Sequence, residues 1–368
     1  MLGPDRSSKK MKKNGFTLIE LLVAMAITGV LMGGMVQMFR SNRIAFDLMK
    51  QMQLVEENGR VGIDFISSDI ASAYFPSTDN ANSSGPMSVY DNVVAPTDEN
   101  NIRSNLSVLA GTDVIELFTT KCLEPITLPS LNENSANTGM FNESSLTGCM
   151  DCYYSGMPTA DFKTCAEQYS ILLRGDAPPA TVNGKCTYNL TSGSNPTGPK
   201  IQLGYNRGNN DVARNMPHTC ADLFTPGNNL PGIGIIGELI YYYVRSDDPN
   251  NTSGAPNPQL MRYVFGGVPE VIANHVEDFQ ALIGEDNDQD GKIDTWANGV
   301  SDPTDIRAVK ISIMLKTPNI DPGKQAQTPK QFANLTILEN STISDLNTSD
   351  LNRRRLVTRT IRLRNMQD

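Results

Sequence analysis

An acidic segment in the last third of the sequence has the residue types and spacing of a calcium-binding loop. Asp286-Asn287-Asp288-Gln289-Asp290-Gly291-Lys292-Ile293-Asp294 matches the first nine positions of the calcium-loop template. In that template alternating carboxylates converge on one cation, and the glycine at the sixth position allows a sharp turn. The sequence therefore predicts a Ca²⁺ site, with a main-chain oxygen at the seventh position. Its candidate ligand residues are Asp286, Asp288, Asp290, Lys292 and Asp294.

The end of this loop departs from the template. Its twelfth position is Ala297 where the template has a bidentate glutamate, so a further oxygen must come from elsewhere, with Asp302 or Asp305 as candidates. Such a site is expected to bind weakly, with Kd on the order of 10⁻⁴ to 10⁻³ M. A solvated acidic turn between two strands is an alternative. Carboxylates for glycoside chemistry are another, although aspartates two residues apart share one direction, which suits a cation better.

All six cysteines lie in the middle of the chain, which we interpret as an inserted subdomain over residues 121–231. The segment is rich in Asn, Gly, Ser, Thr and Pro, so it has little apolar surface to bury and covalent cross-links are the expected source of its order. We predict two or three structural disulfides, with the pairing left open. The alternatives for Cys149-x-x-Cys152 are a redox pair or half of a zinc site, completed by Cys165, Cys186 or His218-x-Cys220. The cysteines are Cys122, Cys149, Cys152, Cys165, Cys186 and Cys220.

Composition argues against catalysis and against nucleic-acid binding. His218 and His275 are the only histidines, and neither belongs to a serine or cysteine pattern of the kind that nucleophilic catalysis needs, so we predict no enzyme. The net charge is −9, which disfavours nucleic acid as a partner. At strand alternation the C-terminal arginines form no single stripe. Arg355 and Arg359 fall on one face, and Arg354, Arg362 and Arg364 on the other.

The N-terminus carries a basic segment followed by an apolar one. Residues 1–15 are polar and basic, and residues 16–39 contain no proline and one charge, Glu20. The apolar run is long enough to cross a bilayer as a helix, and the basic flank places the C-terminal bulk outside the cytoplasm. A signal peptide cut after Ala24-x-Ala26 is the alternative, but that cut falls inside the apolar run. A carboxylate facing lipid is costly, so Glu20 requires a partner.

The residues around the start of the apolar run resemble a known processing signal. Lys12-Lys13-Asn14-Gly15-Phe16-Thr17-Leu18-Ile19-Glu20-Leu21-Leu22 is similar to the class III signal of type IV prepilins and pseudopilins. The resemblance implies that a prepilin peptidase cuts between Gly15 and Phe16 and methylates the new amine. It also implies that the Phe16 ammonium of a neighbouring pilin neutralises Glu20 during assembly. Whether translation begins at Met1 or Met11 stays open.

Beyond residue 39 the apolar positions are spaced three and four apart, which predicts that one helix continues to about Ala73, with residues 40–75 amphipathic. Residues 76–106 are polar and are expected to form a long connection. Later segments alternate as strands do, and strands that accumulate after one helix indicate an α+β fold, a long helix packed on an antiparallel sheet, over residues 76–120 and 232–368. The strand candidates are Val114–Phe118, Gly237–Arg245, Leu260–Phe265, Val276–Ile283, Ala308–Lys316 and Leu356–Leu363.

Two further regions resemble the PilW family of minor pilins. Residues 56–70 carry this likeness in the helix, and this motif is also similar to J-type minor pseudopilins of type II secretion. In the C-terminal part the likeness is carried by the predicted hairpin, the acidic loop and the closing stretch 353–365. It covers residues 11–75 and about 237–368, but not the middle of the chain. The resemblance implies a structural subunit at or near the tip of a type IV pilus, held in the inner membrane with a periplasmic domain before assembly and extracellular afterwards. An adhesin-like tip module that binds a surface ligand, and a secretion pseudopilin, are the alternatives.

Overall fold

A computed structural model of the chain describes residues 17–73, 87–90, 106, 108–109, 111–121, 126–131, 138–142, 146–166, 168–175, 185–197, 200–205, 230–245, 257–264, 267–288, 290–297, 305–318 and 352–363. The chain divides into two compact units, Met1–Met52 and Gln53–Asp368.

The first unit consists of the N-terminal part of helix α1 (Leu18–Ser72), which ends in the second unit. Its apolar side chains are exposed on every side, for example Leu18 at 80%, Val30 at 77% and Phe39 at 72%. The helix is long and apolar enough to cross a membrane by length and composition. A helix that is apolar all round requires lipid or other helices around it.

In the second unit, α1 buries one stripe of its surface. The buried positions are Val55, Gly59, Gly62, Ile63, Ile66 and Ile70. They recur every three or four residues, which places them on one face of a helix. A Cβ at Gly59 would lie 2.8 Å from a methyl carbon of Val357, so a residue without a side chain lets the helix approach the sheet closely.

One antiparallel sheet packs on this stripe. Strand β8 is its centre, and its C-terminal half pairs with β2 on one side and β9 on the other. Ile115, Leu117, Ile240 and Tyr242 face the helix and join its buried residues in one core. The strands are β1 (Met87–Tyr90), β2 (Val114–Thr119), β8 (Leu230–Arg245), β9 (Gln259–Val264) and β10 (Glu270–Asn274).

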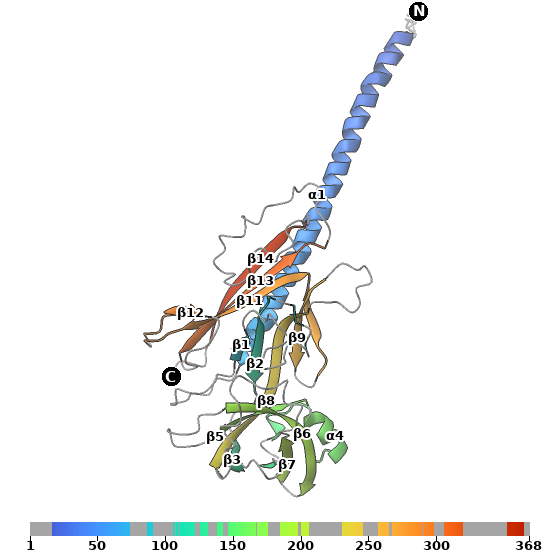
Figure 1. The fold of residues 1–368 in the computed structure, drawn as a ribbon. Helices are drawn as coiled ribbons and strands as arrows, with labels where there is room; N and C mark the ends of the chain where they lie inside the picture. Colours follow the sequence, from blue (N-terminus) through green and yellow to red (C-terminus); the bar gives the residue numbers. More distant parts are fainter. Residues whose placement is uncertain are drawn as a thin grey trace, which may run out of the picture. The chain divides into compact units, whose positions relative to one another are not determined.

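The N-terminal half of β8 belongs to a second group of strands. It pairs with β3 and β5, and the order continues through β6 and β7 to β4 (Figure 1). One unbroken strand therefore links the sheet on the helix to the cysteine-containing segment. The elements of this group are β3 (Ile126–Leu131), β4 (Thr138–Asn142), α4 (Thr159–Ala166), β5 (Ser170–Gly175), β6 (Lys185–Thr197) and β7 (Lys200–Tyr205).

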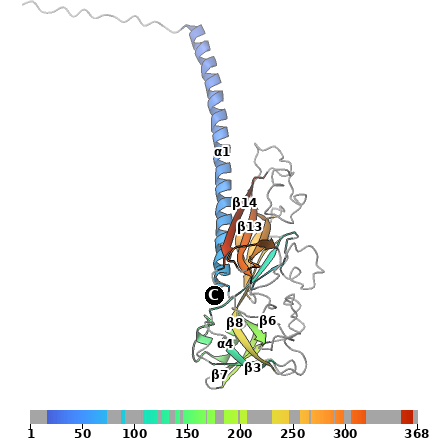
Figure 2. The same ribbon diagram turned by 90° about the vertical axis from the view of Figure 1, so that its left-hand side faces the viewer.

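A four-stranded antiparallel sheet in the order β12-β11-β13-β14 also packs on the buried stripe of α1. Figure 2 shows β13 and β14 alongside the helix in the second unit. Phe279, Ile311 and Ile313 supply fully buried side chains to the shared core. The strands are β11 (Val276–Glu285), β12 (Thr295–Ala297), β13 (Ile306–Lys316) and β14 (Arg354–Arg362).

The arginines of β14 contact acidic residues of the same chain. Arg355 and Arg359, which alternation placed on one face, lie against Glu56 and Asp64 of α1. Arg354 donates from Nε to Glu277 at 2.6 Å, and its side chain is almost fully buried. These three arginines therefore serve contacts within the chain.

The predicted α+β class is confirmed, and so is the helix that ends near Ala73. Each predicted strand corresponds to an observed one, β2, β8, β9, β11, β13 and β14. The expectation of a single sheet is wrong, because two sheets share the helix. Strand β1 lies inside the segment that we expected to be a connection, and β10 was not predicted.

Glu116 of β2 is a buried carboxyl group on the sheet face away from the helix. It accepts a hydrogen bond from the hydroxyl of Tyr90 at 3.3 Å and one from Tyr241, its partner residue on β8. Burial raises the pKa of Glu116 to about 7, and the two tyrosine hydroxyls only partly oppose this.

This raised pKa predicts a pH-dependent stability. Between about pH 4.5 and 7 the folded chain holds a proton on Glu116 that the unfolded chain has lost, so stability falls as the pH rises through this window. Glu116→Gln should remove up to about 3 kcal/mol of that loss. Thermal unfolding of the full chain in detergent at pH 5 and pH 8 measures it, with exposed Glu57→Gln as the control. An equal pH slope in wild type and Glu116→Gln contradicts the assignment.

Candidate functional site

The processing and assembly residues lie at the start of α1. Gly15 and Phe16 lie outside the described residues, and Glu20 lies in the first turn. The Glu20 Oε2 atom accepts hydrogen bonds from the main-chain N–H and the hydroxyl of Thr17, both at 2.9 Å. The N–H of Glu20 donates to the Thr17 hydroxyl at 3.4 Å. This is a capping box, so Glu20 also closes the N-terminus of the helix.

The structure distinguishes between the predicted roles of Cys149, Cys152 and Cys165. Cys152 and Cys165 form a disulfide with their Cα atoms 5.7 Å apart, and Cys149 is disulfide-bonded too. Cys152 therefore does not pair with Cys149, so the alternative of a redox pair at this motif is wrong. Neither residue of the Cys152–Cys165 bond has a free thiolate for zinc. Cys122 and Cys220, with the side chain of Cys186, lie outside the described residues.

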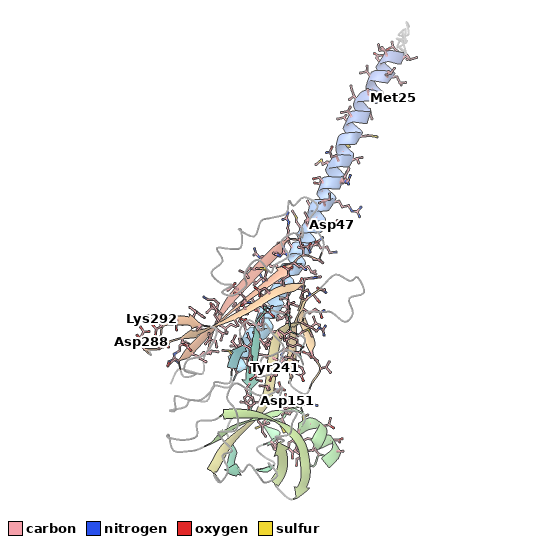
Figure 3. All side chains as sticks on the ribbon, viewed as in Figure 1. Met25, Asp47, Asp151, Tyr241, Asp288 and Lys292 are labelled. Atoms are coloured by element: carbon pink, nitrogen blue, oxygen red, sulfur yellow. A yellow bond between two sulfur atoms is a disulfide. The ribbon has the colours of Figure 1, made fainter. Side chains whose placement is uncertain are left out.

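The acidic loop joins β11 to β12. Glu285 and Thr295 are paired residues at its base, and the N–H of Asp294 donates to the Glu285 carbonyl at 2.8 Å. Trp296 packs over the space left by Gly284, and Lys310 Nζ lies 4.1 Å from the centre of its ring. Asp288 and Lys292 lie at the outer end of this hairpin (Figure 3).

Three of the predicted carboxylates meet in this loop. One oxygen from each of Asp286, Asp288 and Asp294 lies within 4.8 Å of the others, with Asp286 fully buried. The fourth, Asp290, instead contacts Lys292 Nζ at 2.7 Å, and that ion pair lowers the pKa of Asp290. Gly291 has φ +86°, as the sharp turn requires.

The charges around the cluster suit a divalent cation. Arg307 Nε lies 3.1 Å from Oδ2 of Asp286, so three carboxylates and one guanidinium leave a formal charge of −2. The twelfth loop position, Ala297, lies in β12 and offers no carboxylate. Of the suggested substitutes, Asp305 accepts the Asp286 N–H on its main-chain oxygen at 2.8 Å. Asp302 lies outside the described residues.

A further cluster was missed at the level of sequence. Asp69 of α1 accepts a hydrogen bond from the Tyr242 hydroxyl at 2.6 Å and one from Arg262 Nε at 2.7 Å. These partners are 173 and 193 residues away along the chain, so no local spacing could indicate them. The capping box at Thr17 was visible in principle as the T-x-x-E pattern.

Two families match the chain. The family described as "Prokaryotic N-terminal methylation motif" matches residues 10–36, and that described as "Type IV Pilus-assembly protein W" matches residues 241–365. The chain is therefore similar to the PilW family over residues 241–365, about a third of its length. The second match includes the acidic loop and every strand from β9 to β14, whereas the described cysteines lie outside it.

The structural comparison adds little to the PilW assignment. The chain is similar to the "Type IV-like pilin TTHA1219 from Thermus thermophilus" at 13% identity, over 54% of this chain and 84% of that one. The TM-score is 0.19, which is too low to indicate a shared fold. None of the curated proteins compared matches the chain. The PilW match points to a structural family that is not enzymatic.

We propose that the acidic loop binds Ca²⁺ through Asp286, Asp288 and Asp294. At a tenfold excess of Ca²⁺ over Kd, mass action stabilises the folded state by about 1.4 kcal/mol, which corresponds to a rise in Tm of about 2 to 3 °C. Thermal unfolding of the full chain in detergent, with and without 10 mM CaCl₂, measures the shift, and MgCl₂ serves as the ionic-strength control.

Two variants test the ligand set. Asp288→Asn with Asp294→Asn should abolish the calcium-dependent rise in Tm, because it removes two charges from the cluster. Asp290→Asn should keep the rise, because its carboxylate is occupied by Lys292. If Asp290→Asn loses the rise in Tm, Asp290 is a ligand as the sequence template predicts. If wild type shows no rise, the loop is a solvated turn.

Proposed function

We propose that this PilW-family protein is a structural subunit of a type IV pilus, incorporated at or near the tip, where it supports pilus assembly. Before assembly it is anchored in the inner membrane by α1 with its second unit in the periplasm. After assembly it is extracellular. Its partners are the other pilins, and a prepilin peptidase processes it between Gly15 and Phe16.

The observation that carries this proposal is the exposed apolar surface of α1 from Leu18 to Phe39. An apolar surface of this length is covered first by lipid and then by the helices of neighbouring subunits, and both provide the same apolar contacts. The match of residues 10–36 to the N-terminal methylation motif supports processing of this helix before assembly.

The position near the tip rests on the bulk of the second unit. Strands β3 to β7 form a group of strands on the N-terminal half of β8, in addition to the sheet that packs on the helix. A repeating shaft leaves little room for this additional group. At a tip one side of the subunit has no neighbour. The same position favours an adhesin-like binding module as the alternative. A J-type pseudopilin of type II secretion stays as a further alternative, and the match to a pilus-assembly family favours the pilus.

The charge of Glu20 is expected to serve assembly. Glu20→Gln keeps the capping box, because glutamine serves at this position too, but it removes the charge that a neighbouring ammonium would neutralise. The substituted protein should therefore remain stable in the membrane and be at least tenfold depleted in sheared pili, as measured by quantitative mass spectrometry. Glu20→Asp, which keeps the charge, is the matched control. Wild-type amounts of Glu20→Gln in pili would show that the cap alone matters.

Removal of the cysteine-containing part separates the structural role from the adhesive one. Thr119 and Glu238 are paired residues on β2 and β8, so an Asn-Gly turn can replace residues 120–237 and close a two-residue hairpin. A structural tip subunit should still support piliation and attachment after this replacement. An adhesin should keep its pili and lose attachment, as counted by electron microscopy and a surface-binding assay.

Both forms of the proposal require the protein to be scarce in the pilus. Its abundance in sheared pili, relative to the main subunit, should be on the order of one per filament. Abundance equal to that of the main subunit contradicts both forms of the proposal. Loss of all pili after the replacement, with the shortened protein stable in the membrane, assigns the cysteine-containing part to assembly itself.

A further inference from the structure

The second unit contains a small cavity where three parts of the fold meet. It lies between the end of α1, strands β2, β8 and β9, and the segment that carries Cys149, Asp151 and Tyr169. Figure 3 shows Asp151 at the border between the helix-bearing sheet and the strands around β5 and β6. Its volume of about 260 Å³ is below the range of pockets for drug-sized ligands. The space suits a group the size of an amino-acid side chain.

Two ion pairs line this cavity. Asp69 and Arg262 form one, with 2.7 Å between carboxylate and Nε, and both side chains are mostly buried. Lys121 and Asp151 form the other, and both are exposed. Each pair has no net formal charge, so the two pairs together leave the cavity neutral.

Glu238 of β8 adds one carboxylate that has no such partner. Its side chain lines the cavity and is partly buried, and no described residue forms a hydrogen bond or ion pair with it. Burial raises the pKa of Glu238. Among the described residues, the charges near Glu238 oppose each other, since Arg262 and Lys121 lower that pKa and Asp151 and Asp69 raise it. Counted over the described residues that line it, the cavity therefore holds one excess negative charge in a partly desolvated place.

The arrangement does not suit a metal ion. Among the described residues, the acidic groups whose oxygens converge within reach of one ion are those of the β11–β12 loop, and the cavity carboxylates Asp69, Asp151 and Glu238 are not among them. A single carboxylate can neutralise a monovalent organic cation and accept hydrogen bonds from its N–H groups. Ile240 and Cys149 provide the apolar part of the wall.

We propose that this cavity binds a primary alkylammonium group, with the ammonium on the Glu238 carboxylate and the alkyl chain along Ile240. A free amine and a lysine side chain of a protein share this chemistry. The Tyr169 hydroxyl accepts the N–H of Asp151 at 2.8 Å, which positions a further polar oxygen on the cavity wall. The proposal does not depend on the pilus role, because it rests on the cavity alone.

The test is calorimetric titration of the full chain in detergent at pH 8 and low ionic strength with n-butylammonium chloride. Wild type should bind it with a Kd in the millimolar range or below, and Glu238→Gln should bind at least tenfold more weakly because it removes the charge and keeps the shape. Glu270→Gln, which neutralises an exposed carboxylate at the start of β10, is the matched control and should bind as wild type does.

Further probes make the result decisive. Sodium butyrate and n-butanol should not bind. The Tm of Glu238→Gln should equal or exceed that of wild type, because the partly desolvated charge is gone, so lost binding cannot come from unfolding. No binding of n-butylammonium by wild type up to 20 mM, full binding by Glu238→Gln, or equal binding of butyrate overturns the proposal.

The source of the ammonium follows from a second titration. N-acetyl-lysine methylamide that binds at least tenfold more tightly than n-butylammonium assigns the cavity to a lysine side chain of a protein. Equal affinities assign it to free amines. In both cases acetylation of the lysine Nζ atom should abolish binding, and retained binding of the acetylated form contradicts the proposal.

Discussion

Burial of one stripe of α1 is the interaction on which the second unit depends. Ile63, Ile66 and Ile70 are each almost fully buried in the core shared by the helix and both sheets, and burial of one such side chain contributes roughly 1.5 to 3 kcal/mol. The exposed ion pairs of Asp64 and Glu56 with the arginines of β14 add little to this. The partly buried contacts of Asp69 fix which turn of the helix faces Tyr242 and Arg262.

The same helix meets two different environments along its length. Up to Phe39 its apolar side chains are exposed all round, and from Val55 onward only one face is buried. The change in surface follows the change in composition, since Glu20 is the one charged residue between residues 16 and 39 and charged side chains become frequent after residue 39. The first part of helix α1 therefore needs lipid or other helices around it. The apolar face of the second part is covered by the sheets of the same chain.

The parts of the fold that could be predicted from sequence are those set by local pattern. The apolar run and the alternation in β8, β9, β11 and β13 are visible in neighbouring residues, and the structure confirms them. Strands β1 and β10 are short, with four and five residues, too few for alternation to stand out from a polar connection. The division into two sheets depends on pairing between distant strands. The disulfide between Cys152 and Cys165 spans 13 residues, from a turn to α4, and their spacing did not distinguish it from other pairings.

The candidate sites divide in the same way. The spacing of the acidic loop indicated that its carboxylates meet. It did not indicate the ion pair of Lys292 with Asp290 or that of Arg307 with Asp286. Glu238 lies in a strand that was predicted, yet its cavity is formed by residues from α1, β9 and the cysteine-containing segment. Such a site depends on tertiary structure, so sequence pattern could not have indicated it.

The continuity of β8 has a mechanical consequence. Residues 230–237 are hydrogen-bonded to β3 and β5, and residues 238–245 to β2 and β9, within one covalent strand. Tension applied to the outer strands therefore passes along the backbone of β8 into the sheet on the helix, where it acts as shear across whole ladders of hydrogen bonds. Shear loads many such bonds at once, whereas peeling breaks them one after another. The cysteine-containing part is thus attached in a geometry that resists a pull directed along β8.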